Sequence, residues 1–206
     1  MNPRSIMQQA PVIPVLAFTS VPQALEQSEA LIRGGLTVLE ITLRTPVALE
    51  CISEVTKAFP DAQVGAGTVL NPAQLDSVLQ AGATFAVSPG ATDSLWKAAV
   101  ECQANLLAGT ATVSDVMRGL EYGFDAFKFF PAEINGGVNA LKGFAGPLPD
   151  VVFCPTGGVK PSNLNDYLAL PNVLCAGGTW LTPEGASAQD IEQLARQAIT
   201  QARGAH

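Results

Sequence analysis

The sequence predicts an α/β protein of the (β/α)8 TIM barrel class, formed by a single domain over residues 1–206. Apolar runs rich in β-branched and aromatic residues recur about every 20 to 26 residues, with helical patterns between them. The runs are continuously apolar, which is typical of parallel strands buried on both faces. Eight such units close naturally into a barrel. In chain order the runs are Val12–Phe18, Thr37–Leu43, Gln63–Val69, Phe85–Pro89, Asn105–Thr110, Ala126–Ala132, Val151–Gly158 and Val173–Trp180.

Helix signals fill the intervals between these runs. Proline is tolerated in the first turn of a helix, where its missing N–H would be unsatisfied anyway, and this predicts helices opening at Pro22, Pro46, Pro72 and Pro161. Two later helices open with the spacing of a capping box, at Thr112/Asp115 and Ser187/Asp190. The last helix has an apolar face at helical spacing, made by Ile191, Leu194, Ala195, Ala198 and Ile199.

An open, doubly wound sheet is the alternative arrangement of the same elements. That fold usually has a G-x-G-x-x-G turn after its first strand. The first run here is followed by Thr19–Pro22, and the nearest similar segment, residues 65–70, lacks the third glycine. No linker, low-complexity tract or change in composition divides the chain, so we expect one domain.

Composition indicates a globular protein with part of its surface covered. Hydrophobic residues make up 48% of the chain and charged residues 14%, against roughly 25% charged in ordinary soluble domains. Disordered chains show the opposite balance. The shortage of charge is a hint that partner subunits cover some of the surface.

Charge and apolar patterning exclude several partners. The net charge is −7 and the eleven Lys and Arg residues are scattered, so no positive footprint exists for nucleic acid or an anionic membrane surface. No apolar run reaches the roughly 18 residues of a membrane span. Residues 1–10 lack the apolar core of a secretory signal. We expect a cytoplasmic protein.

Cysteine and histidine usage limits the possible chemistry. The single histidine, His206, excludes histidine-ligated zinc and Ser-His triads, and we expect no metal. The cysteines form no C-x-x-C pair and lie among apolar neighbours, so we expect them to be buried and reduced; they are Cys51, Cys102, Cys154 and Cys175.

Polar residues interrupt the second apolar run on one face. Glu40, Thr42 and Arg44 alternate with leucine and isoleucine, so a strand places all three on the same side. The apolar side packs against helices, which directs the polar side into the barrel. Buried charge is costly unless it is paired or used. Glu40 is a candidate for proton transfer, and Arg44 for binding a substrate carboxylate with its guanidinium fork. A structural Glu–Arg pair is the alternative.

Lys128 lies among three phenylalanines in the sixth run. Burial disfavours the charged ammonium, and a neutral amine attacks carbonyl carbons to form a Schiff base. The alternatives are a lysine that reaches solvent from a strand end, or one paired with Glu40 or Glu133. With Glu40 and Arg44 in the same barrel, we favour the nucleophile.

Paired glycines end the seventh and eighth runs, as Gly157-Gly158 and Gly177-Gly178. The loops after these strands form the usual phosphate site of barrel enzymes. Glycine lets backbone N–H groups approach a phosphate closely, and a helix N-terminus adds a favourable dipole. These two strand ends therefore predict a phosphate site.

Two further residues end apolar runs. Thr68, after the third run, is placed to donate a hydrogen bond to the same carboxylate as Arg44. Pro89, after the fourth run, either shapes the wall of a pocket or simply ends its strand.

The motifs together resemble the class I 2-keto-3-deoxy-6-phosphogluconate (KDPG) aldolase family, whose members often also cleave 4-hydroxy-2-oxoglutarate (KHG). The resemblance runs in order from about Pro11 to Ala198. It is carried by LEITLRT, VGAGTVLNP, SPG, FKFFPAE, NGGV, FCPTGGV and LCAGGTW.

The resemblance implies a barrel, a cytoplasmic homotrimer, and cleavage of a phosphorylated keto acid to pyruvate and glyceraldehyde 3-phosphate in the Entner–Doudoroff pathway. It implies no cofactor beyond a covalent imine between the substrate and Lys128. Glu40 would be the general acid/base. The implied substrate contacts are Arg44 and Thr68 at the pyruvate carboxylate, Pro89 and Phe130 in the pyruvate pocket, Thr156 near the new stereocentre, and Gly157, Gly158, Gly178 and Thr179 at the phosphate.

The chain departs from the family pattern at three points. Ala108 stands where proline is expected, which touches none of the implied roles. Thr179 replaces the common serine with another hydroxyl. The first strand lacks an arginine found in some relatives, which leaves the preferred aldehyde open.

Three rival functions remain open from the sequence. One is an aldolase for the galactonate analogue of the substrate. The second is a metal-free isomerase or epimerase of sugar phosphates. The third is a non-catalytic sensor that binds a phosphosugar without forming an imine.

Overall fold

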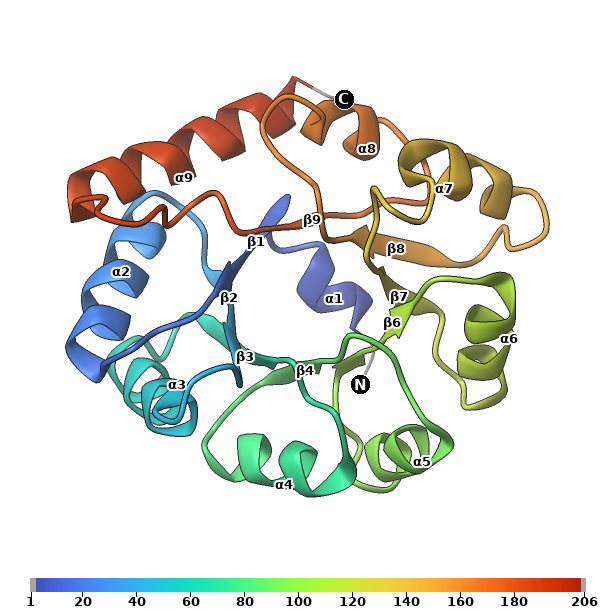
Figure 1. Cartoon of the computed structure of the whole chain (residues 1–206), viewed down its shortest axis with the longest axis horizontal. Helices are drawn as coiled ribbons and strands as arrows, with labels where there is room; N and C mark the ends of the chain where they lie inside the picture. The colour runs from blue at the N-terminus through green and yellow to red at the C-terminus, as the bar shows by residue number, and fades with distance from the viewer. Residues whose placement is uncertain (1–2, 205–206) are drawn as a thin grey trace.

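The strands surround a central axis and the longer helices lie outside them (Figure 1). The computed structural model of the chain describes residues 3–204. The strands are β1 Val12–Leu16, β2 Val38–Thr42, β3 Gln63–Gly67, β4 Phe85–Val87, β5 Leu106–Leu107, β6 Gly109–Thr110, β7 Ala126–Phe129, β8 Val152–Pro155 and β9 Ala176–Gly178. The helices are α1 Arg4–Met7, α2 Val21–Arg33, α3 Ala48–Ala58, α4 Pro72–Gln80, α5 Asp93–Glu101, α6 Val113–Glu121, α7 Gly137–Ala145, α8 Leu164–Leu168 and α9 Ala188–Arg203.

All strand pairs are parallel. One sheet has the order β5-β4-β3-β2-β1-β9 and the other β6-β7-β8. A bridge between Thr156 and Gly177 links β8 to β9. Neighbouring strands follow chain order without the reversal of a doubly wound sheet, so the alternative considered from the sequence is wrong. Parallel pairing brings the carboxyl ends of the strands to one edge of each sheet.

Each of the eight predicted apolar runs contains a strand, but the fifth is divided. Ala108 separates β5, which pairs with β4, from β6, which pairs with β7. The Ala108 carbonyl accepts a hydrogen bond from the Lys128 N–H at 2.9 Å. The backbone at Gly109 passes so close to the Pro89 carbonyl that a side chain there would overlap it. The break therefore marks the change of partner from one sheet to the other.

The helix starts agree with the sequence at four sites and differ at two. Pro22 and Pro72 lie in the first turns of α2 and α4, and both capping boxes form. The prediction was wrong for Pro46 and Pro161. A turn closed by the Ala48 N–H to Thr45 carbonyl bond precedes α3. Before α8, a similar turn is held by Asn163, and each proline lies in its turn instead of in the helix.

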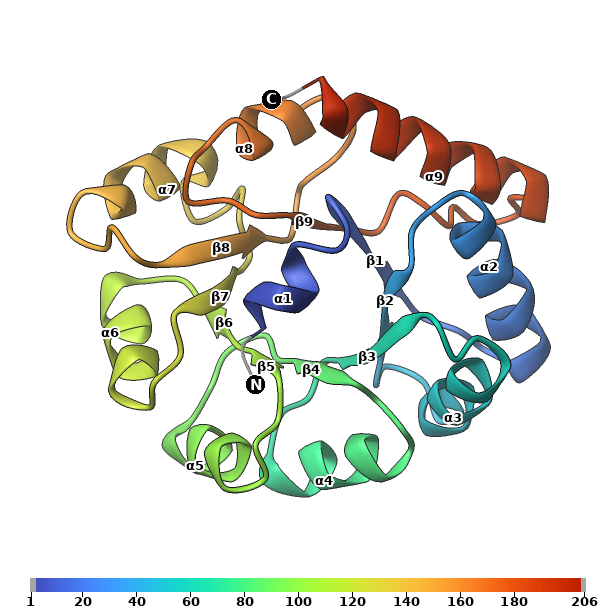
Figure 2. The ribbon, with the colours of Figure 1, turned by 180° about the vertical axis from the view of Figure 1, so that it is seen from behind.

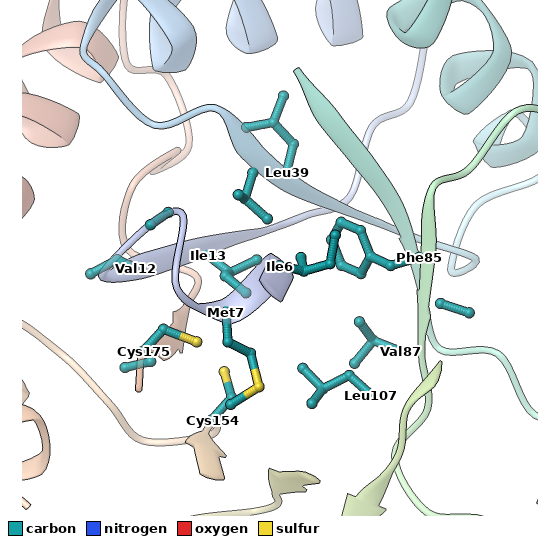
Figure 3. Close-up of a cluster of buried hydrophobic side chains, with 14 of the residues drawn as sticks. Ile6, Met7, Val12, Ile13, Leu39, Phe85, Val87, Leu107, Cys154 and Cys175 are labelled. Atoms are coloured by element: carbon teal, nitrogen blue, oxygen red, sulfur yellow. The ribbon is translucent and has the colours of Figure 1, made fainter. Parts of the chain in front are cut away.

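A short helix that the sequence analysis did not predict, α1, lies at the centre of the ring of strands in both views (Figures 1 and 2). Its Ile6 and Met7 are buried in the same apolar cluster as side chains from β4, β5 and β8. In Figure 3 the Met7 side chain points toward Cys154. The interior is therefore packed with side chains at the end where the strands begin.

The four cysteines are free thiols, but only three are buried as expected. Cys102 is exposed because α5 ends at Glu101 and Cys102 forms its C-terminal cap. His206 lies outside the described residues. Within residues 3–204, no helix is long and apolar enough to cross a membrane.

The capping box of α6 generates a test of stability against pH. The Asp115 carboxylate accepts hydrogen bonds from the N–H groups of Ala111 and Thr112, at 3.0 and 2.9 Å, and from the Thr112 hydroxyl. Partial burial alone raises the pKa of Asp115, but these hydrogen bonds outweigh burial and lower its pKa below the usual value. The ionised carboxylate therefore stabilises the fold.

We predict that Asp115→Asn lowers the free energy of unfolding by about 1 kcal/mol near neutral pH. A lowered folded-state pKa gives stability above the unfolded pKa, and this stability is lost as the pH falls through the folded value. The difference from wild type should therefore shrink below about pH 4. Urea unfolding at several pH values measures it, with Asp61→Asn at an exposed turn as control. A difference that is constant with pH would contradict this role.

Candidate functional site

Lys128 of β7 and Glu40 of β2 form a buried ion pair. The Lys128 Nζ lies 3.5 Å from the Glu40 Oε1, and the two side chains are 5% and 4% exposed. The sequence analysis left Glu40 and Glu133 open as partners of Lys128. The structure pairs Lys128 with Glu40, and the Glu133 carboxylate instead accepts a hydrogen bond from the Tyr167 hydroxyl.

Two glycines of β3 make room for side chains of the neighbouring strands, Gly67 for Glu40 and Gly65 for Phe85. In the parallel register Glu40 lies opposite Gly65, and Thr42 lies opposite Gly67. A Cβ on Gly67 would overlap the Glu40 carboxylate, and a Cβ on Gly65 would overlap the Phe85 ring. Only glycine at position 67 therefore leaves the space in which the carboxylate meets Lys128.

The pair is close but incompletely satisfied. The Glu40 Oε1 is buried and makes no hydrogen bond with any described residue. The Lys128 Nζ also lies 5.0 Å from the centre of the Phe130 ring. A buried carboxylate oxygen without a donor is costly and is retained where it has a task. The arrangement can pass a proton between the amine, the carboxylate and a bound molecule.

Arg44 and Thr68 meet just beyond the carboxyl ends of β2 and β3. The Arg44 Nε donates a hydrogen bond to the Thr68 Oγ1 at 3.2 Å. Thr68 holds a left-handed backbone with φ of 62°, which is strained for a β-branched residue and aims its hydroxyl. Arg44 is exposed, and its other guanidinium nitrogens bond to no described residue. They are free to bind a carboxylate in the fork geometry.

Pro89 and Phe130 follow β4 and β7 and line one cavity of about 180 Å³. Gly109 and Trp96 contribute to the same wall. Both predicted pocket residues are half-buried, so each presents part of its surface. The structure thus brings them together at the carboxyl edge of the strands.

Thr156 ends β8 as a buried residue beside β9. A Cβ on Gly177 would overlap the Thr156 hydroxyl, so glycine at position 177 is needed for this contact. The Thr156 Oγ1 lies 3.5 Å from the Cys154 carbonyl, a weak interaction that leaves the hydroxyl available to a ligand.

The loop after β8 is held by its carbonyls. The Gly157 carbonyl accepts a hydrogen bond from the Glu133 N–H at 3.1 Å, and the Gly158 carbonyl from the Asn163 Nδ2 at 3.2 Å. Both glycines have left-handed backbones, with φ of 95° and 81°. Among residues 3–204, the N–H groups of Gly158 and Val159 donate to no acceptor. Such a loop presents donors to an anion.

The loop after β9 is the second predicted phosphate segment. Gly178 ends the strand, and a Cβ there would overlap the Trp180 ring. Thr179 is exposed, and its N–H has no acceptor in the part of the chain that the structure describes. The favourable helix dipole expected for the loop after β8 is not supported, because the helix that follows that loop, α8, has only five residues and begins at Leu164, after an intervening turn.

Two buried thiols, Cys154 of β8 and Cys175 just before β9, lie next to each other. Cys154 is opposite Lys128 in the register of β7 and β8. Burial raises the pKa of the Cys175 thiol, and the neighbouring Cys154 raises it further. Cys175 therefore stays protonated and adds no charge to the buried interior.

Sequence reasoning missed the glycines at 65 and 67 as parts of the site, and it did not foresee that Gly177 makes room for the Thr156 hydroxyl. A signal existed for the first two, because glycines two residues apart on one strand remove side chains from the same face. It also missed the contact between Glu133 and Tyr167, which lie on different elements and share no sequence pattern. No group of three metal-ligating side chains gathers within residues 3–204.

Similarity to known proteins agrees with this geometry. Residues 4–197 match the family described as KDPG and KHG aldolase. The chain is 51% identical to the KHG/KDPG aldolase of Escherichia coli strain K12, over 97% of this chain and 95% of that protein.

Two solved structures share the fold closely. The KDPG aldolase of Zymomonas mobilis ZM4, crystallised with 3-phosphoglycerate, is 50% identical with a TM-score of 0.93, over 96% of this chain and 94% of the other. The KDPG aldolase of Legionella pneumophila, with pyruvate captured as a covalent carbinolamine intermediate, is 44% identical with a TM-score of 0.95, over 97% and 98%. The chain therefore belongs to the KDPG and KHG aldolase family.

Proposed function

We propose that this protein is a class I aldolase that reversibly cleaves KDPG to pyruvate and glyceraldehyde 3-phosphate. The observation that carries the proposal is the buried Lys128–Glu40 pair, in which the Lys128 Nζ lies 3.5 Å from the Glu40 Oε1 and no described residue forms a hydrogen bond with that oxygen. An amine and a proton acceptor that face each other away from water are the two groups that imine chemistry needs.

The proposed reaction begins with imine formation. Glu40 takes a proton from the Lys128 ammonium, and the free lone pair attacks the C2 ketone of the substrate. The carbinolamine receives a proton through Glu40, loses water and becomes an iminium. The iminium draws electrons from C3, so no metal is needed to polarise the carbonyl.

Cleavage follows from the same two groups. Glu40, directly or through water, removes the proton of the C4 hydroxyl. The C3–C4 bond breaks, its electrons enter the iminium to form an enamine, and C4 becomes the aldehyde of glyceraldehyde 3-phosphate. Protonation of C3 and hydrolysis of the imine release pyruvate and restore Lys128. In the reverse direction Glu40 deprotonates the methyl group of bound pyruvate.

The residues at the strand ends hold the substrate in this proposal. Arg44 and Thr68 bind the pyruvate carboxylate, and their mutual hydrogen bond fixes their geometry. Phe130, whose ring centre lies 5.0 Å from the Lys128 Nζ, is assigned to the wall around the pyruvate carbons together with Pro89. Thr156 faces the carbon where the new stereocentre forms. The unpaired N–H groups of the two glycine loops support a phosphate site at Gly157, Gly158, Gly178 and Thr179.

Cleavage of KHG to pyruvate and glyoxylate uses the same imine and is a second activity in this proposal. Glyoxylate carries no phosphate, so this reaction does not need the glycine loops. An aldolase for the galactonate analogue would share the chemistry. The relatives at 50% and 51% identity are named for the gluconate-type substrate, which favours KDPG.

We also propose the finer architecture. The Thr156–Gly177 bridge and the Lys128 to Ala108 hydrogen bond join the two sheets, which supports closure into one (β/α)8 barrel over residues 1–206. The low charge content and the family support a cytoplasmic homotrimer.

Pyruvate with borohydride should reduce the imine to a stable adduct, and mass spectrometry of peptides should find it on the peptide that contains Lys128. Lys128→Met removes the nucleophile at similar length and should abolish the adduct, whereas Lys97→Met on α5 should not. An adduct on another lysine would contradict the assignment of Lys128. No adduct on folded protein would favour a phosphosugar isomerase or a sensor.

Glu40→Gln should slow pyruvate release from KDPG by about 10²–10⁴-fold, because the amide cannot accept the proton. Coupling to lactate dehydrogenase measures the rate. Glu50→Gln, on the exposed side of α3, is the matched control and should retain wild-type turnover. Undiminished turnover in Glu40→Gln would refute the proton-transfer role.

An exposed apolar stripe on α6 is the surface that we assign to the trimer. Val113, Met117 and Leu120 recur at helical spacing and are 36%, 55% and 40% exposed. Light scattering should give about three times the chain mass of 21.4 kDa. Met117→Glu should reduce the mass, because it places a charge in the contact, whereas Gln197→Glu on α9 should not. A trimer unchanged by Met117→Glu would place the interface elsewhere.

A further inference from the structure

The Gly157–Gly158 loop packs against the side chain of Glu133, a residue that has no role in the proposed reaction. Gly158, with its left-handed backbone, lies directly against Glu133, and a Cβ on Gly158 would come within 2.6 Å of the Glu133 Cβ. The Glu133 N–H also donates to the Gly157 carbonyl at 3.1 Å. One residue therefore contacts both glycines, through its backbone and through its side chain.

The Glu133 carboxylate is itself fixed from the other side. It accepts a hydrogen bond from the hydroxyl of Tyr167, a fully buried residue of α8. Burial raises the pKa of Tyr167, and the Glu133 carboxylate raises it further, so the phenol remains a donor. A Cβ at Gly137 would also come within 3.1 Å of the Glu133 Oε1 and within 3.0 Å of the Tyr167 hydroxyl, so the first residue of α7 packs onto this contact.

The position of the Glu133 carboxylate matters because it is negatively charged and lies near backbone N–H groups that could bind a phosphate. The N–H groups of Gly158 and Val159 have no acceptor among residues 3–204. A carboxylate and a phosphate compete for the same kind of donor. The Tyr167 hydroxyl holds the Glu133 carboxylate in place, so the loop keeps its N–H groups available.

We propose that Glu133 and Tyr167 are positioning residues that shape the Gly157–Gly158 loop for the phosphate of the substrate and thereby set the preference for a phosphorylated aldehyde. This inference rests on the proposed aldolase function. Neither residue touches the reacting atoms. Their effect is therefore confined to the end of the substrate that carries the phosphate.

The test uses two aldehydes that differ only in the phosphate. Each is condensed with pyruvate: D-glyceraldehyde 3-phosphate and D-glyceraldehyde. In wild type, kcat/KM should be much higher for the phosphorylated aldehyde. Tyr167→Phe should lower this preference about tenfold, the loss of one charge-assisted hydrogen bond, because the released Glu133 carboxylate then competes with the phosphate for the loop N–H groups. Glu133→Ala should lower the preference for a different reason, because it removes the side chain that packs against Gly158 and shapes the loop. The loss should come from a higher KM for the phosphorylated aldehyde, with kcat unchanged and glyceraldehyde unaffected.

Matched controls are available on α6 and beside it. Glu121→Ala changes an exposed glutamate, and Tyr122→Phe changes a tyrosine that stacks on Trp96; both should keep the wild-type preference. Adduct formation with pyruvate and borohydride, together with thermal melting, shows that each variant is folded and has a working Lys128.

The possible outcomes distinguish failure of the role of Glu133 and Tyr167 from failure of the proposed aldolase function. A wild-type enzyme that prefers the phosphorylated aldehyde, with variants that keep that preference, overturns the role of Glu133 and Tyr167 alone. Equal losses for both aldehydes overturn it too, because they indicate a general structural role. A wild type without preference overturns the phosphate site and this inference together. Failure of wild type to form the pyruvate adduct overturns the aldolase function itself.

Discussion

The burial of two opposite charges, on Lys128 and Glu40, is the constraint on which the rest of the site depends. Removing each ion from water costs several kcal/mol, and their attraction repays this only with good geometry and further hydrogen bonds. Here the geometry is incomplete, since the Glu40 Oε1 lies 3.5 Å from the Lys128 Nζ and forms no hydrogen bond with any described residue. Such a pair is a poor device for stability and a suitable one for moving a proton. The surrounding strands supply the stability that the pair does not.

The reacting residues lie within the strands, and the residues assigned to substrate binding lie at or after the strand ends. Lys128 and Glu40 lie within β7 and β2, where the hydrogen-bonded backbone holds them rigidly. The residues assigned to substrate binding follow the carboxyl ends of the strands, where the backbone is free to adopt unusual angles. Thr68, Gly157 and Gly158 all have left-handed backbones at such ends. Rigid placement serves the reacting groups, and loop geometry serves recognition.

The sequence predicted what depends on periodicity. Strand alternation placed Glu40 on an inward face, and the apolar runs located every strand, because burial on both faces leaves a continuous signal. It failed where a contact joins distant elements or where a turn replaces a helical turn. Pro46 fits a turn as well as a helix start, so proline alone could not distinguish them. Tyr167 and Glu133 come into contact only in the folded protein, and the sequence around either residue does not predict this contact.

The sequence analysis also failed to predict which side chains are exposed at helix ends. Cys102 has apolar neighbours in the chain, yet it lies just after the last turn of α5, where side chains turn outward. The glycines of β3 were visible in the sequence, but their purpose depends on which side chains of the neighbouring strands, Glu40 of β2 and Phe85 of β4, extend over them. Strand register is a property of the folded sheet, and it determines which neighbouring side chain occupies the space that a glycine leaves empty.

The central position of α1 has a consequence for the order in which parts of the chain fold. Ile6 and Met7 are synthesised before the strands that surround them, yet the cluster that buries them includes Cys154 and Cys175, which come much later in the chain. During synthesis these two side chains have no finished interior to enter. The α1 helix therefore reaches its final packing only after the later strands have formed, and it packs early strands against late ones.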